Sequence, residues 1–102
     1  METSKILQEI IKRFKENGAA QVEGYNSFGY IKETAKAIYV SREKGKDTPI
    51  SFSKLTIGIE AYKSNPSLYD LGPAALRDYG ITHVTSPIWS LLHLIKKVEY
   101  SN

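Results

Sequence analysis

The sequence contains no cysteine and no long hydrophobic run. Without cysteine, the chain forms neither disulfides nor thiolate metal sites. Residues 1–16 mix lysine, arginine and glutamate among apolar residues, which is not the pattern of a signal peptide. No stretch approaches the roughly 20 apolar residues that span a bilayer. These absences predict a soluble cytoplasmic protein with no membrane partner.

The sequence also lacks the residue spacings of common metal and nucleotide sites. Neither His-x-x-x-His nor Glu-x-x-His occurs, and no glycine-rich loop is followed by lysine and a serine or threonine. The two histidines, His83 and His93, could act as an acid and base pair, but nothing in their spacing brings them together. We therefore predict no enzyme activity, no metal ion, no cofactor and no small-molecule substrate.

What the sequence does contain is the composition of a folded domain. It has 102 residues, of which 41% are hydrophobic and 25% are charged, and these values predict one domain over residues 1–102. The formal net charge is +3, which permits an anionic partner without requiring one.

Hydrophobic periodicity predicts an all-α fold of about five helices. The predicted helices cover residues 3–17, 31–42, 53–62, 73–79 and 87–99, and residues 19–30 are predicted as mostly loop with a short hairpin as the alternative. Thr3 or Ser4 is the expected cap of the first helix, and Gly18 its stop. Ser53 is the expected cap of the third helix, and Gly80 is expected to close the fourth.

The last predicted helix is amphipathic. Its apolar arc consists of Ile88, Leu91, Leu92, Ile95 and Val98. Ser90, His93 and Lys97 fall on the opposite arc, and Trp89, Lys96 and Tyr100 lie between the two. We expect the apolar arc to pack and the remaining residues to form a partly exposed strip.

The stretch GPAALRDYGITHVTSPIWSLLHLIKK, residues 72–97, resembles a helix-turn-helix. In that motif the second helix enters the DNA major groove, and hydroxyls near its start hold phosphates. The resemblance implies that Thr82, His83, Thr85 and Ser86 lie at the docking end, that Ser90, His93, Lys96 and Lys97 follow the exposed side, and that Arg77 contributes from the preceding helix. We predict a small DNA-binding regulatory module, with RNA as a possible partner and a homodimer as a possible form.

Each of these residues also has a simpler interpretation. Thr85 and Ser86 are good capping residues, and lysines near a helix end interact favourably with its dipole. The alternative function is a protein-interaction or oligomerisation module, in which Trp89 and Tyr100 are anchors. Seven tyrosines in so small a chain favour some exposed aromatic residues. A second basic segment contains Arg42, Lys44 and Lys46, and we interpret it as a solvated loop.

Overall fold

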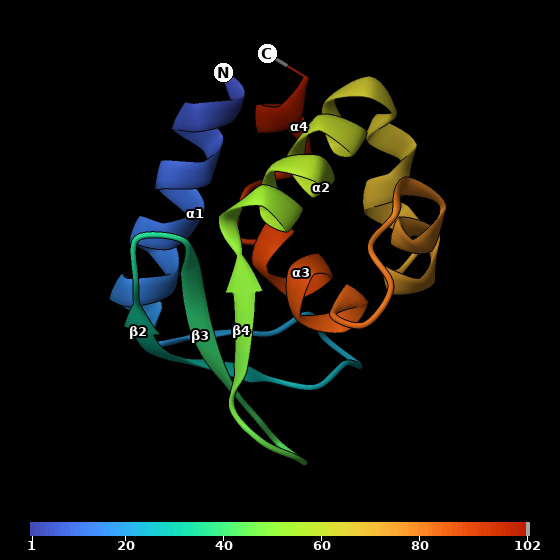
Figure 1. Ribbon diagram of the computed structural model, residues 1–102. Coiled ribbons are helices and arrows are strands. Elements are labelled where there is room, and N and C mark those ends of the chain that lie inside the picture. The colour runs from blue at the N-terminus through green and yellow to red at the C-terminus, as the bar shows by residue number, and fades with distance from the viewer. Residues whose placement is uncertain (102) are drawn as a thin grey trace.

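The computed structural model describes residues 1–101 and contains a four-stranded antiparallel sheet packed with helices (Figure 1). The predicted all-α class is therefore wrong. In chain order the elements are α1 (Thr3–Asn17), β1 (Ala19–Ala20), β2 (Phe28–Glu33), β3 (Ala37–Arg42), β4 (Thr48–Ser51), α2 (Phe52–Ser64), the 3₁₀ helices η1 (Pro66–Asp70) and η2 (Pro73–Tyr79), α3 (Thr85–Leu92) and α4 (Lys97–Tyr100). The strand order is β1-β2-β3-β4. No helix among residues 1–101 is both long and apolar enough to cross a membrane.

The first predicted helix is confirmed as α1. Its buried face consists of Ile6, Ile10 and Phe14, which recur at the spacing of one helical face. Gly18 ends the helix with a φ of 76°, a left-handed conformation that glycine adopts without the steric cost of a Cβ. Neither predicted cap is used, because Glu2 occupies the capping position without a side-chain hydrogen bond.

The second predicted helix, residues 31–42, is wrong, because this segment forms most of the β2–β3 hairpin. The chain reverses at Thr34, whose amide donates to the Ala37 carbonyl oxygen at 2.8 Å and whose hydroxyl oxygen accepts from the Ala37 amide at 3.1 Å. In β3, Ile38 and Val40 are buried while Tyr39 between them is half-buried. This period of two identifies a strand with one face in the core.

The third predicted helix is confirmed as α2, with an earlier start. Ser51 caps it, because its hydroxyl oxygen accepts from the Lys54 amide at 3.2 Å, so the predicted cap Ser53 lies within the first turn. The predicted stripe of Leu55, Ile59 and Tyr62 is buried. Since α2 begins directly after β4, the capping serine also joins the sheet to the helical layer.

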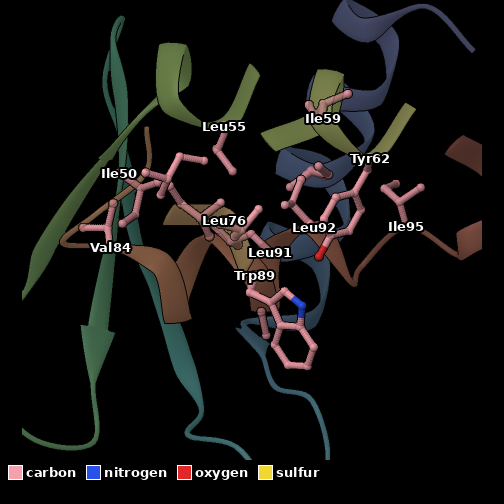
Figure 2. Close-up of a cluster of buried hydrophobic side chains, with 14 of the residues drawn as sticks. Ile50, Leu55, Ile59, Tyr62, Leu76, Val84, Trp89, Leu91, Leu92 and Ile95 are labelled. Carbon is pink, nitrogen blue, oxygen red and sulfur yellow. The ribbon is translucent and has the colours of Figure 1, made fainter. Parts of the chain in front are cut away.

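The region predicted as the last helix, residues 87–99, is divided into two helices. The shorter α3 ends at Leu92, and α4 begins only at Lys97. The predicted fourth helix forms as the 3₁₀ helix η2, and Gly80 closes it with a φ of 87° as expected. Side chains from α2, η2 and α3 meet in one buried cluster, part of which Figure 2 shows.

Candidate functional site

The helix α3 lies inside the molecule. All six residues from Pro87 to Leu92 are buried, and the side chains of Leu91 and Leu92 lie in the core cluster (Figure 2). Ser90, predicted to face outward, is only 2% exposed. A recognition helix must present one side to the DNA groove, so the predicted helix-turn-helix arrangement is wrong for this fold.

The residues predicted for DNA contact are divided between the two ends of α3. Arg77, Thr82 and His83 are exposed on η2 and the following loop, and Thr85 and Ser86 are half-buried in the first turn of α3. Beyond the other end of α3, Lys96 and Lys97 are exposed. These residues do not form the single exposed strip that the sequence predicted.

The carboxyl-terminal segment is held to α1 by Glu99. The Arg13 guanidinium donates to the two Glu99 carboxylate oxygens at 3.0 and 2.9 Å, and to the Leu94 carbonyl oxygen at 2.8 Å. This hydrogen bonding lowers the pKa of Glu99. Tyr100, predicted as a surface anchor, is 2% exposed and donates its hydroxyl to the Leu92 carbonyl oxygen. Burial raises the pKa of that hydroxyl.

Four aromatic rings form a row beside α3. The Tyr69 and His93 ring centroids are 4.0 Å apart, those of His93 and Trp89 4.2 Å, and those of Trp89 and Tyr25 4.6 Å. The row begins on η1, crosses α3 and ends on the loop between β1 and β2. Only Tyr25, at its end, is an exposed residue, with 45% of its surface accessible.

The four rings line a pocket of about 390 Å³, which we call the aromatic pocket. The other residues that line it are Val22, Asp70, Leu71 and Gly72. In Figure 2 the six-membered ring of Trp89 points away from Leu91 and Leu92, at the edge of the buried cluster. The pocket therefore adjoins the core at Trp89 and opens beside the exposed side chains of Tyr25 and Leu71.

Hydrogen bonds already occupy most polar groups of the aromatic pocket. The His93 ring nitrogens lie 2.7 Å from the Trp89 carbonyl oxygen and 2.9 Å from the Tyr69 carbonyl oxygen. The Tyr69 hydroxyl donates to the Ile95 carbonyl oxygen at 3.2 Å. Both ring nitrogens face carbonyl oxygens of the chain, so His93 bridges the end of α3 and η1 rather than directing a nitrogen into the pocket.

A second candidate is a set of basic residues in the two hairpins and at the start of α2. Six basic residues lie between residues 28 and 54, and we call this set the basic strip: Lys32, Lys36, Arg42, Lys44, Lys46 and Lys54. Lys32 lies over the Tyr39 ring, with its ammonium 4.7 Å from the ring centroid. Lys44 and Lys46 flank Gly45 in the exposed β3–β4 turn. The sequence had singled out only three of the six, those at the turn.

Two of the three acidic residues in this segment are engaged elsewhere. Glu33 pairs with Lys15 of α1 at 2.5 Å, and Glu43 accepts a hydrogen bond from the Ser27 amide. The four ion pairs found among residues 1–101 include no member of the basic strip. The strip therefore presents positive charge that the described part of the chain does not neutralise by ion pairing.

Comparisons with protein-family models, with characterised proteins and with solved structures found no match to this chain. Among residues 1–101, no three histidine, cysteine, aspartate or glutamate side chains are grouped so that they could hold a metal ion. The aromatic pocket and the basic strip are the two features of the molecule from which we infer a function.

Proposed function

We propose that the protein binds nucleic acid through the basic strip, by contacts between its lysine and arginine side chains and phosphates. The observation that supports this proposal is the distribution of basic and acidic residues along the sequence. Residues 28–54 contain six basic and three acidic residues and so have a net charge of +3. The rest of the chain has eight of each, which cancel, so the whole net charge of the protein belongs to this segment.

The arrangement of the strip suits a polyanion better than a single small anion. Its members are spread over β2, both hairpin turns, the end of β3 and the first turn of α2. Lys32, Lys36, Lys44 and Lys46 are exposed, so each can reach a phosphate without disturbing the core. Repeated phosphates along a nucleic-acid backbone match such a distribution, and each neutralised phosphate releases counterions.

The test is fluorescence anisotropy with labelled single-stranded and duplex oligonucleotides at about 50 and 200 mM salt. We expect micromolar binding at the lower salt and a steep loss at the higher one. Lys44→Gln with Lys46→Gln should weaken binding about tenfold and reduce the slope of log affinity against log salt by roughly two, since each phosphate contact contributes about one.

The matched control replaces Lys5 and Lys12, two exposed lysines of α1, by glutamine. This pair makes the same change in net charge away from the strip and should leave both affinity and salt slope nearly unchanged. Absence of binding at the lower salt, or an equal loss in both double variants, would contradict the proposed interface.

A protein-interaction or oligomerisation module is the second candidate. The observation that favours it is Leu71, whose 63% exposure places an apolar side chain at the aromatic pocket beside the exposed Tyr25. Sedimentation velocity tests self-association directly. A dimer that Leu71→Asp converts to a monomer would support this candidate. If the unmodified protein is a monomer at all concentrations, self-association is not its function.

A further inference from the structure

The aromatic pocket has a shape and a lining suited to a planar ring. Tyr69, His93, Trp89 and Tyr25 contact one another in succession with their ring planes tilted by 34°, 48° and 58°, and the last of them is exposed. A flat ligand that enters beside Tyr25 and Trp89 would continue this row by stacking, the arrangement that aromatic rings prefer. The volume of about 390 Å³ lies within the range of small-molecule pockets.

The polar side chains of the pocket determine which chemical groups a ligand ring should carry on its edge. The His93 nitrogens and the Tyr69 hydroxyl have partners, and the Trp89 ring nitrogen is buried without a hydrogen bond. The side-chain groups left for a ligand are the Asp70 carboxylate and the Tyr25 hydroxyl. A carboxylate only accepts hydrogen bonds when ionised, so the ring should carry N–H donors on its edge.

A positive charge lies next to that carboxylate. The Lys97 ammonium donates to Asp70 at 2.5 Å, and both side chains are largely exposed, at 47% and 62%. An exposed ion pair of this kind contributes little to stability, so a ligand can share the carboxylate at little cost. Lys97 can then meet an anionic group attached to the ring. A nucleotide combines these features, because it has a planar ring with N–H donors on its edge and an attached phosphate.

We propose that the aromatic pocket receives one unpaired base of a single-stranded nucleic acid, and that guanine fits it best because its N1–H and 2-amino donors both face one carboxylate. This inference rests on the proposed nucleic-acid function. The base stacks on the exposed ring of Tyr25, which itself contacts Trp89, while its donor edge meets Asp70 and its phosphate meets Lys97. Bases become available in this way in single strands, where aromatic side chains commonly stack on them.

One hydrogen bond joins the loop that contains Tyr25 to the β3–β4 turn that contains Lys44 and Lys46. The Ser27 amide, two residues after Tyr25, donates to the Glu43 carboxylate at the start of the β3–β4 turn. In Figure 1 the connection between β1 and β2 and the β3–β4 turn lie at the same end of the molecule. One strand of nucleic acid can therefore contact the strip with its phosphates and place a base in the pocket.

The single tryptophan of the chain makes the pocket directly observable. Trp89 is the only tryptophan, so intrinsic tryptophan fluorescence reports on this site alone. We expect a short single-stranded oligonucleotide of mixed sequence to quench it, and GMP to quench it at lower concentration than UMP. Tyr25→Ala should remove the exposed end of the row and weaken oligonucleotide binding about tenfold, as loss of one stacked base typically does.

Asp70→Asn is the second variant, because it keeps the shape of the side chain and replaces one acceptor oxygen by a donor. It should abolish the preference for GMP over UMP. Tyr79→Ala is the matched control, since it removes an exposed tyrosine of η2 that does not line the pocket, and it should bind as the unmodified protein does. Circular dichroism establishes that each variant is folded.

The two proposals fail in different ways. If no oligonucleotide raises the anisotropy at about 50 mM salt, the proposed nucleic-acid function is wrong. If oligonucleotides bind while Trp89 fluorescence stays constant and Tyr25→Ala binds normally, the strip binds nucleic acid and the base pocket is wrong. A preference for duplex over single strand, or equal quenching by GMP and UMP, would also overturn the inference.

Discussion

The helix α3 and the β3–β4 turn differ in burial and in charge. Six consecutive residues of α3, Pro87 to Leu92, are buried, whereas five consecutive residues of the turn, Glu43 to Asp47, are exposed. The helix contains one tryptophan and no charged residue, and the turn contains two lysines and two acids. Burial of an apolar helix stabilises the fold, while exposure of charge allows contact with a partner.

This contrast separates stability from binding. Substitutions of Ile88, Leu91 and Leu92, the fully buried residues of α3, should change the free energy of unfolding and not binding, whereas Trp89 of the same helix also lines the aromatic pocket. Substitutions in the turn should change binding and leave the free energy of unfolding nearly constant. The predictions below test this division, beginning with the largest expected change in stability.

Ile88→Ala should lower the free energy of unfolding by about 2–5 kcal/mol, because Ile88 is fully buried and its truncation leaves a cavity. The measurement is urea unfolding followed by circular dichroism. Ile57→Ala in α2 is the control, since Ile57 is 43% exposed and its truncation should cost much less. Equal losses in the two variants would mean that α3 is not the centre of the core.

The sequence was sufficient to predict those elements whose stability is decided locally. The helix α1 has a full apolar stripe and a glycine stop, and both are confirmed. The buried stripe of α2 was likewise predicted, because Leu55, Ile59 and Tyr62 recur at helical spacing. The closure of η2 at Gly80 depends on one residue that tolerates a positive φ.

The β2–β3 hairpin was not predicted, because the apolar residues of this segment fit both the period of a helix and the period of a strand. Ile31, Ala35, Ile38 and Tyr39 share one face of a hypothetical helix, while Ile38 and Val40 alternate as in a strand. The turn at Thr34 decides between them, because it brings β2 back against β3. A β-branched residue pair flanking tyrosine was the available strand signal.

The candidate site was predictable only in part. The sequence singled out Trp89, His93 and Lys97, which do lie at or beside the aromatic pocket, but for a different reason. Tyr25 and Tyr69 join them through tertiary packing that no local pattern reveals. The basic strip could have been found by counting charge segment by segment, since residues 28–54 alone account for the net charge.

Glu99→Gln should lower the free energy of unfolding by about 1–2 kcal/mol at neutral pH, because it weakens the paired hydrogen bonds from Arg13. Since the folded pKa of Glu99 is lowered, its contribution is complete above the ordinary value of 4.5 and is lost as the pH falls through the folded value. The free energies of unfolding of the variant and the unmodified protein should therefore converge progressively as the pH falls below 4.5.

Glu16→Gln is the control for this pH profile, because Glu16 is exposed near the end of α1 and forms none of the ion pairs found among residues 1–101. Its free energy of unfolding should follow that of the unmodified protein at every pH. A Glu99→Gln variant as stable as the control at neutral pH would show that the carboxyl-terminal segment is held by Tyr100 rather than by the Arg13 contact.

Ser51→Ala should cost about 1 kcal/mol, because it removes the side-chain acceptor of the Lys54 amide at the start of α2. Ser53→Ala, at the position that the sequence predicted as the cap, should cost less. Thermal unfolding of the two variants distinguishes them. A larger loss for Ser53→Ala would place the beginning of α2 two residues later and separate it from β4.

Lys44→Gln with Lys46→Gln should change the free energy of unfolding by no more than about 0.5 kcal/mol, the usual range for exposed positions without special contacts. Neither side chain forms an ion pair among the described residues, and both belong to an exposed turn. Because the same variant is expected to weaken oligonucleotide binding about tenfold, urea unfolding and anisotropy on one sample test the division directly. A loss of stability as large as that of Ser51→Ala would mean that the turn lysines stabilise the fold, and Lys32 and Lys36 would then be the exposed strip residues left to contact phosphates.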